Sequence, residues 1–382
     1  MVYLDHASSV PVDPRVLAFA GRYLKEEYGN PSSLYALGLS AKQAVEEARV
    51  RVAALVHAET PSTIVFTGSA TESNNLAVRG TALRNRKKGK SILVSAIEHV
   101  SVLNPAKDLQ KQGFDLGFVP VDRYGVVDLV FLEEHLAPET TVVSVHYAND
   151  EIGTVEPIRE AAAIVHEKGA YLHVNATAAA GRIPIDVQKD GIDLLTLSGN
   201  DLGGPRGASA LYIRPGVKVQ TVMPGGGQEK GLRSGTENVF AIAGMGEAAR
   251  IAALEMEDEM AREKVVRDSL IEEVLTIEDS YLTGHPDFRL PNHASFRFSR
   301  IEGESILLNL DTFFGIQVAT GSACTSRTLE PSHVLLAIGL AHEEAHGSVV
   351  MSLGRSNTMG DVPLVGRAMK ETVTRLRSIS PL

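Results

Sequence analysis

The sequence predicts an α/β fold with a mostly parallel sheet, and two observations support this prediction. Short runs of β-branched and apolar residues alternate with longer amphipathic runs up to about residue 240. Several of the short runs are almost continuously apolar, which is typical of strands that are buried on both faces of a parallel sheet. A chain of 382 residues also exceeds the usual size of a single core, so two lobes are expected.

The expected elements follow this alternation in order. Strands are expected over residues 63–67, 91–95, 116–120, 141–145, 171–175, 194–197 and 208–213. Helices are expected over residues 39–57, 72–86, 101–112 and 158–168, where apolar residues recur at helical spacing.

The pattern changes in the last third of the chain. A long helix with alternating acidic and basic residues is expected over 241–278, followed by short elements at 293–298, 302–310 and 317–320. These short elements are typical of a smaller α+β lobe. We therefore expect a large α/β domain over 15–250, a small C-terminal domain over 251–382, and an N-terminal segment, 1–14, that packs with the small domain.

Composition excludes several classes of protein. A formal net charge of −10 disfavours a surface for nucleic acid or anionic membrane, since both need clustered Lys and Arg. The N-terminus shows no secretory signal, and the chain has no apolar run of about 18 residues that would span a membrane. One cysteine excludes an internal disulfide framework. A cytoplasmic protein is expected.

Two segments have the composition of anion-binding turns. Residues 67–75 (TGSATESNN) follow a strand and open a helix, where backbone N–H groups can approach an anion. The alternative is an ordinary strand–helix turn capped by Thr71. Residues 225–236 (GGGQEKGLRSGT) form a glycine-rich loop with Arg233, Ser234 and Thr236, which is either a phosphate contact or a plain surface loop.

Three further candidates are a histidine, a cysteine and a metalloprotease-like motif. His99 follows the strand 91–95, at the edge of the sheet where open α/β folds bind ligands. Cys324 stands in ATGSACTS, among small polar residues, which favours a nucleophilic or metal-binding thiolate over core packing. Residues 342–346 (HEEAH) match the zinc motif H-E-x-x-H, but the helix around them is too short and no third ligand follows, so a zinc site is not expected.

Taken together and in order, ten stretches resemble the NifS/IscS-type cysteine desulfurases over nearly the whole chain. They are YLDHASSVPVDPRV, GNPSSLYALG, VFTGSATESNNLAV, EHVSV, NDEIGTVEPI, SGNDLGGPRGASALYIR, PGGGQEKGLRSGTENV, IEGESILLNL, ATGSACTSRTLEPSHVL and SLGR. The resemblance implies the aspartate-aminotransferase-like fold (fold type I of pyridoxal-phosphate, PLP, enzymes), a homodimer, and PLP between the two domains. Members pass the sulfur of L-cysteine, as a persulfide on a loop cysteine, to IscU-like iron–sulfur scaffold proteins.

The resemblance assigns roles to several positions of this sequence. Ala70 and Thr71 match a phosphate-contacting pair, and His99 matches the residue that stacks on the PLP ring. Two further phosphate ligands match Ser198 and Thr236, of which the second reaches the cofactor of the neighbouring subunit. Cys324 matches the persulfide cysteine.

Other positions depart from the family pattern in the reactive part of the site. The motif S-G-H-K is Ser198-Gly199-Asn200-Asp201 here, so the amine that forms the imine with PLP is replaced by a carboxylate. Arg206 is no substitute, because a guanidinium stays protonated. In lacking the lysine, the chain resembles certain archaeal members of the family.

Four more substitutions concern groups around the cofactor and substrate. Asn175 replaces the aspartate that pairs with the pyridine nitrogen, and Ala178 replaces a glutamine that contacts the ring hydroxyl. A cofactor-contacting asparagine is Asp150, and the arginine that binds the substrate carboxylate is Val350.

These residues leave three hypotheses. The first is a cysteine desulfurase whose PLP, if bound, is held non-covalently and whose activity is impaired. The second is an inactive dimeric partner that uses external sulfide and supplies Cys324 as a metal ligand to a [2Fe–2S] cluster shared with a scaffold protein. The third is a new cation or amine ligand in a cavity that is more acidic than that of the family because of Asp150, Asn175, Asn200 and Asp201.

Overall fold

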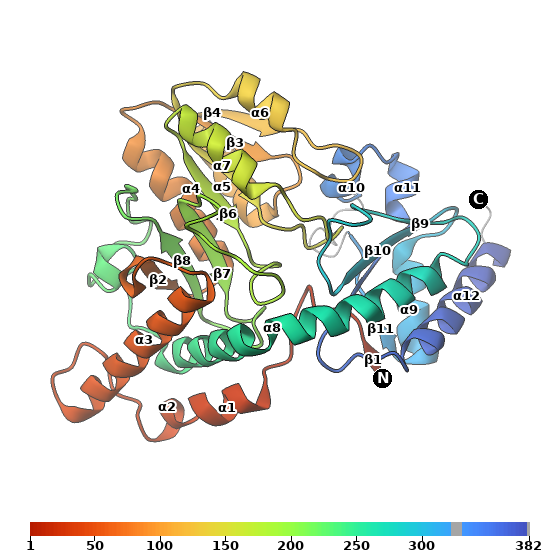
Figure 1. The fold of residues 1–382 in the computed structure, drawn as a ribbon, viewed down its shortest axis with the longest axis horizontal. Coiled ribbons are helices and arrows are strands. Elements are labelled where there is room, and N and C mark those ends of the chain that lie inside the picture. Colours follow the sequence, from red (N-terminus) through yellow and green to blue (C-terminus); the bar gives the residue numbers. More distant parts are fainter. Residues whose placement is uncertain (322–330, 380–382) are drawn as a thin grey trace.

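The computed structural model describes residues 1–321 and 331–379 and has two lobes joined by one long helix (Figure 1). The large lobe contains a seven-stranded sheet in the order β2-β8-β7-β6-β5-β3-β4. The pairs from β4 through β3, β5 and β6 to β7 are parallel, whereas β8 runs antiparallel to both β7 and β2. The sheet is therefore mixed but mostly parallel, as predicted.

The expected strands form within one or two residues of their predicted ends. The large sheet consists of β2 (Ile64–Thr67), β3 (Ser91–Ser95), β4 (Asp115–Val119), β5 (Thr140–His146), β6 (Tyr171–Asn175), β7 (Leu194–Ser198) and β8 (Ser209–Ile213). All seven residues of β5 (TTVVSVH) are buried, as expected for a central strand that is covered on both faces.

Helices cover both faces of this sheet. One face carries α4 (Ala70–Asn85) and α5 (Val100–Lys111), and the other carries α3 (Ala36–Leu55), α7 (Ile158–Glu167) and the first part of α8 (Val239–Val274). Alternate strand residues divide between these cores: Ile92 and Val94 pack with α4 and α5, while Leu93 belongs to the main core on the opposite face.

The small lobe is built on an antiparallel sheet in the order β12-β10-β9. Its elements are β9 (Ser280–Leu282), β10 (His293–Phe298), α9 (Gly303–Phe314), β11 (Ile316–Gln317), α10 (His333–Ala337), α11 (His342–His346), β12 (Ser348–Ser352) and α12 (Val362–Ile379). The remaining elements are β1 (Val2–Tyr3), α1 (Pro14–Ala20), α2 (Arg22–Lys25), α6 (Leu129–His135) and the short 3-10 helices η1 (Pro61–Thr63) and η2 (Glu229–Gly231).

The N-terminal strand and α8 connect the two lobes. β1 pairs in parallel with β11, and Val2 and Leu4 belong to the core of the small lobe. The first half of α8 lies in the large-lobe core, whereas Val266, Leu270 and Val274 belong to the small-lobe core. The exact division at 14 and 250 stays a prediction. In the described ranges, none of the helices has the length and apolarity needed to cross a membrane.

A buried ion pair fixes the glycine-rich loop to the large lobe. Arg49 donates to both oxygens of Glu229 at 2.8 and 2.7 Å, and both side chains are almost fully buried. Glu229 Oε2 also accepts from the backbone N–H of Phe66 at 2.8 Å. Glu229 and its neighbour Lys230 both have positive φ, 45° and 59°, so these contacts hold a strained turn in place.

We predict that Glu229→Gln destabilises the protein by about 3–5 kcal/mol, because it leaves the buried Arg49 charge without its partner. The measurement is the free energy of unfolding in urea. Glu46→Gln is the matched control, since Glu46 binds the same guanidinium from an exposed position and should cost less than about 1 kcal/mol. Equal losses in the two variants would contradict the assignment.

Candidate active site

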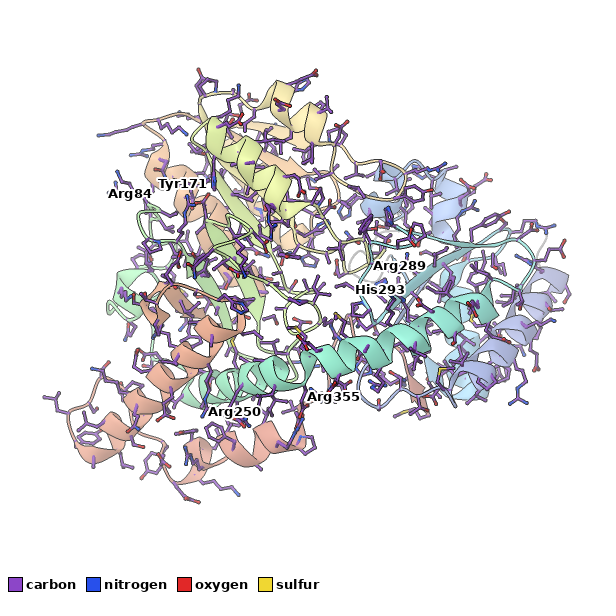
Figure 2. All side chains as sticks on the ribbon, viewed as in Figure 1. Arg84, Tyr171, Arg250, Arg289, His293 and Arg355 are labelled. Carbon is purple, nitrogen blue, oxygen red and sulfur yellow. The ribbon has the colours of Figure 1, made fainter. Side chains whose placement is uncertain are left out.

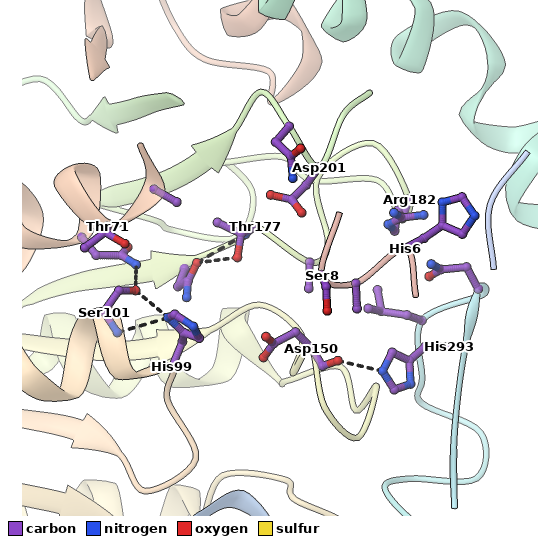
Figure 3. Close-up of a pocket in the computed structure, with 18 residues that line it drawn as sticks. His6, Ser8, Thr71, His99, Ser101, Asp150, Thr177, Arg182, Asp201 and His293 are labelled. Carbon is purple, nitrogen blue, oxygen red and sulfur yellow. Dashed lines mark hydrogen bonds between the residues drawn. The ribbon is translucent and has the colours of Figure 1, made fainter. Parts of the chain in front are cut away.

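A cavity lies where the carboxyl ends of the parallel strands face the small lobe (Figure 3). Residues at the ends of four strands form its floor. His99 follows β3, Asp150 follows β5, Asn175 ends β6, and Asp201 follows β7. The remaining walls come from the N-terminal segment, the start of α4 and the small lobe. The lining residues are His6, Ala7, Ser8, Ala70, Thr71, Asn74, His99, Ser101, Asp150, Asn175, Thr177, Ala178, Arg182, Asn200, Asp201, Leu290, Asn292 and His293. We call this the first cavity.

The N-terminus of α4 forms one end of the first cavity. Ser69 is the N-cap, since its hydroxyl accepts from the N–H of Glu72 at 3.2 Å. The alternative of a turn capped by Thr71 is therefore not what forms: Thr71 lies inside the first turn, because the extended backbone of a cap occurs two residues earlier. Ala70 and Thr71 line the cavity, as the resemblance implies for them.

The ring of His99 is oriented by the start of α5. Its Nδ1 accepts from the backbone N–H of Ser101 at 3.1 Å and lies 2.7 Å from the Ser101 hydroxyl. That hydroxyl in turn accepts from the amide of Asn74 at 2.8 Å. Since a backbone N–H can only donate, Nδ1 carries no proton, and the ring proton of neutral His99 is on Nε2.

Beneath His99 lies a buried group of two carboxylates and an imidazole. Glu98 accepts from the hydroxyl of Ser144 and from the N–H of His99, at 2.9 and 3.1 Å. His146 lies 3.9 Å from Glu98 and 3.3 Å from Glu156. Burial lowers the pKa of His146, but the contact with Glu156 and the charge of Glu98 outweigh it and raise that pKa. This group fixes the turn that presents His99.

Asp150 lies in a turn that also connects the two lobes. The side chain of Asn149 accepts from the N–H groups of Glu151 and Ile152, both at 2.9 Å, which shapes the turn. The carbonyl of Asp150 accepts from Nε2 of His293 in the small lobe at 2.8 Å. His293 lies at the boundary between the lobes (Figure 2). The backbone of Asp150 is thus held from both sides.

The next residue, Glu151, makes a second contact between the lobes. The hydroxyl of Ser332, the N-cap of α10, donates to Glu151 Oε2 at 2.6 Å, while Oε1 is buried without a hydrogen-bond partner in the described chain. Burial raises the pKa of Glu151 to about 8. This side chain is therefore largely a neutral acid at pH 7.

Asn175 directs its side chain to its own turn. It ends β6 and is buried, and its Oδ1 accepts from the hydroxyl of Thr177 at 3.0 Å and from the N–H of that residue at 3.4 Å. Ala178, three residues beyond the strand on the same turn, contributes only a methyl group to the cavity and packs against the main core. Neither residue brings a charge to this wall.

Asp201 places a carboxylate where the sequence departs most from the family pattern. Burial raises its pKa to about 6, although a hydrogen bond from Ser198 and the charge of Arg182 act in the opposite direction. Ser198, which the resemblance implies as a phosphate ligand, is buried at the end of β7 and is not among the lining residues. Asn200, beside Asp201, does line the cavity.

The structure leaves some predicted residues outside the first cavity. Thr236 is exposed and lies away from it, and Arg233 is paired with Glu72 at 2.8 Å. Val350 is buried in β12 and pairs with Ser295 of β10. Cys324 lies outside the described residues.

Residues that the sequence analysis did not single out line the small-lobe end of the cavity. His6 and Ser8 come from the N-terminal segment, Arg182 from the turn after β6, and Asn292 and His293 from the start of β10 (Figure 3). His6 and Ser8 stand in a matched stretch and Asn292 and His293 stand at a predicted strand, whereas Arg182 carries neither signal. Their convergence depends on the packing of the two lobes.

The H-E-x-x-H segment forms α11, a helix of five residues. Glu344 accepts from the N–H of Ala341 and pairs with Arg297 at 3.1 Å, so this carboxylate stabilises the N-terminus of the helix. Among residues 1–321 and 331–379, no group of three His, Cys, Asp or Glu side chains is arranged to hold a metal ion.

Comparison with known proteins identifies the family. The class-V aminotransferase family matches residues 2–365. A protein of Archaeoglobus fulgidus named cysteine desulfurase IscS 1 is 54% identical over 382 residues, which cover all of this chain and 99% of that protein. The chain belongs to the cysteine desulfurase family of class-V aminotransferases. A cysteine desulfurase IscS of Methanosarcina thermophila is 46% identical over all of this chain and 94% of that protein.

A solved structure of a NifS-like protein confirms the fold. It superposes with a TM-score of 0.91 at 34% identity, over 98% of this chain and all of that one. The fold predicted from the resemblance, that of the PLP-dependent transferases of fold type I, is therefore correct. The family implies PLP as its cofactor.

We predict that Asp201→Asn stabilises the protein by about 2–3 kcal/mol at pH 7.5 and far less at pH 4.5. The folded-state pKa of about 6 exceeds the ordinary value of 3.8, so stability is lost as the pH rises between these values and the loss is complete above them. The amide removes this loss and keeps an oxygen that accepts from Ser198.

The free energy of unfolding at the two pH values measures this difference. Asp115→Asn, at an exposed aspartate in β4, is the control and should change stability equally at both pH values. A gain for Asp201→Asn that does not depend on pH would contradict the prediction.

Proposed function

We propose that this chain acts in iron–sulfur cluster assembly, as a cytoplasmic homodimer that transfers sulfur or ligates a cluster through Cys324. The relatives named cysteine desulfurase IscS support the assignment. The motif GSACTS is intact in the sequence, and IscU-like scaffold proteins with L-cysteine or sulfide are the partners that the family implies. Whether Cys324 transfers sulfur or ligates a cluster depends on whether the first cavity can support PLP chemistry.

The observation that carries the proposal is the carboxylate of Asp201. No lysine lines the first cavity in the described chain, and a carboxylate forms no imine with an aldehyde. Ser198, which the resemblance implies as a phosphate ligand, is buried outside the first cavity and acts on Asp201, whose pKa it lowers. The residues present therefore do not fit PLP in the covalent form used by the family.

Two neighbouring positions support the same conclusion. Asn175 offers no negative charge for a protonated pyridine ring, because its oxygen already accepts from Thr177. Val350 contributes no donor to a substrate carboxylate, where a bidentate arginine would give orientation as well as affinity. We therefore infer that desulfuration of L-cysteine is impaired in this chain.

A second candidate function is supported by the contrast between cavity and cysteine. An inactive partner that retains the thiolate of Cys324 would complete the coordination of a [2Fe–2S] cluster on a scaffold protein with three cysteine ligands, with sulfide from another source. Retention of the GSACTS motif in a chain whose cavity is altered favours this function over simple loss of activity.

Exposed apolar side chains support the homodimer. Several large ones cluster in the sequence between α1 and the start of α3: Leu17, Leu24, Tyr28, Leu34, Tyr35 and Leu39. Leu34 is 90% exposed in the single chain, which is unfavourable for a surface that stays in water.

We predict that the purified protein mixed with PLP shows no imine absorbance and releases sulfide from L-cysteine at least about a hundredfold more slowly than a lysine-containing cysteine desulfurase. Spectra from the near ultraviolet to the visible and a sulfide assay measure both. Asp201→Lys should restore imine absorbance, since it returns the amine to the floor of the cavity. Sulfide release by the unmodified chain at the rate of the lysine-containing enzyme would refute the proposed impairment.

We also predict that Cys324→Ala abolishes retention of a [2Fe–2S] cluster in a complex with a scaffold protein and leaves the dimer intact. Visible absorbance of the complex and size-exclusion chromatography give the two readouts. Ser326→Ala, in the same segment, is the matched control and should retain the cluster. A cluster that survives Cys324→Ala would remove the central claim of the second candidate function.

A further inference from the structure

A second cavity lies behind the first one, against α8. It measures about 210 Å³, which is far more than the roughly 10–15 Å³ that one water molecule needs. Its walls are the N-terminal segment 10–16, the turns at 181–182 and 201–203, the middle of α8, and the loop 354–356. His6, Arg182 and Asp201 line both cavities and form the partition between them.

The walls of the second cavity are mostly apolar. Val10, Val12 and Val16 line one side, and Ile251 and Met260 of α8 line the other. The polar residues gather at its two ends. A cavity with apolar walls and a few convergent polar groups is the usual form of a site for a small organic molecule.

At the rim, the charged side chains are paired. Asp13 binds Arg15 at 2.7 Å, and Glu259 binds Arg262 at the same distance. Arg355, which lies beside α8 in Figure 2, pairs with Glu255. These groups need no ligand.

At the inner end, the two charged side chains have weak partners or none. The guanidinium of Arg182 makes no hydrogen bond or ion pair with any residue of 1–321 or 331–379. Glu263 is only 5% exposed, and its one ionic contact in the same ranges is Arg262 at 3.7 Å. Burial raises the pKa of Glu263, although the charges of Arg182 and Arg262 act against this.

His6 completes the inner end with two more unused groups. It is 3% exposed, and neither ring nitrogen has a hydrogen-bond partner in the described chain. Burial and the charge of Arg182 lower the pKa of His6 to about 4, so at neutral pH the ring offers one donor and one acceptor. Buried polar groups are rarely left unpaired, which points to a ligand beside His6.

We propose that the second cavity binds an α-amino acid with a non-polar side chain. The carboxylate accepts from Arg182 and from the N–H of His6, and the ammonium group donates to Glu263 and Asp201. The side chain then extends along the valines and α8 toward the rim. This binding requires neither PLP nor Cys324, so it goes beyond the function proposed above.

The charges at the inner end select a zwitterion over simpler molecules. A carboxylate without an amine would place a third negative group beside Asp201 and Glu263. An amine without a carboxylate would give the guanidinium of Arg182 no hydrogen-bond acceptor. A ligand that carries both charges offers a partner to each of the three side chains.

Isothermal titration calorimetry of the full-length protein tests this proposal with L-leucine as the probe. We expect L-leucine to bind at least about tenfold more tightly than 4-methylpentanoate, which lacks the amine, or 3-methylbutylamine, which lacks the carboxylate. Glycine, without a side chain, should bind more weakly than L-leucine. The proposal is overturned if L-leucine gives no binding heat up to about 10 mM, or if either analogue binds as tightly.

Two variants remove the groups that hold the ligand. Arg182→Gln and Glu263→Gln should each weaken the binding of L-leucine by about tenfold or more. Arg250→Gln is the matched control, because it makes the same exchange on α8 at an arginine that is paired with Glu247 and does not line the second cavity, so affinity should be unchanged. Circular dichroism checks that each variant is folded, and the comparison of ligands on the unmodified protein does not depend on them. Equal weakening by Arg182→Gln and Arg250→Gln would also overturn the proposal.

Discussion

Four parallel strands, β3, β5, β6 and β7, end at the same edge of the large sheet, and the floor of the first cavity depends on that edge. Parallel pairing brings the residues that follow each strand together although they are separated by dozens of positions in the chain. His99, Asp150, Asn175 and Asp201 are neighbours for this reason alone. Helices on both faces keep the strands buried, so the edge is rigid enough to position side chains.

On this scaffold, the charge at the floor differs from what the family implies. A half-buried carboxylate at 201 stands where the family has an amine, and its partial removal from water, rather than a like charge, is the main reason for its raised pKa. The neighbouring guanidinium of Arg182 moderates this effect without a hydrogen bond, and it does the same for Glu263 in the second cavity. The charged residues of the partition between the cavities therefore influence one another. A change of charge at one of them alters the electrostatics of both cavities.

The two lobes meet at the same place. His293 donates to the carbonyl of Asp150, and Ser332 donates to Glu151, so adjacent residues of one turn are held by two elements of the small lobe. Because these bonds are formed by polar groups with little contact to water, they define how the lobes pack better than apolar contacts alone would. The first cavity keeps its shape only while this packing lasts.

The sequence by itself determined the strands, their order of appearance and the family, because the period of apolar residues and the ordered motifs are local properties of the chain. It also determined that Asp201 cannot serve as the amine. It could not identify the cap of α4, for which Thr71 was one alternative, since several small polar residues there can each accept from a helix N–H and only the backbone geometry selects Ser69. Only the tertiary structure decided that His6 and Arg182 line two cavities at once, because their partners come from the opposite lobe and from α8, and no periodicity in the chain records a contact of that range.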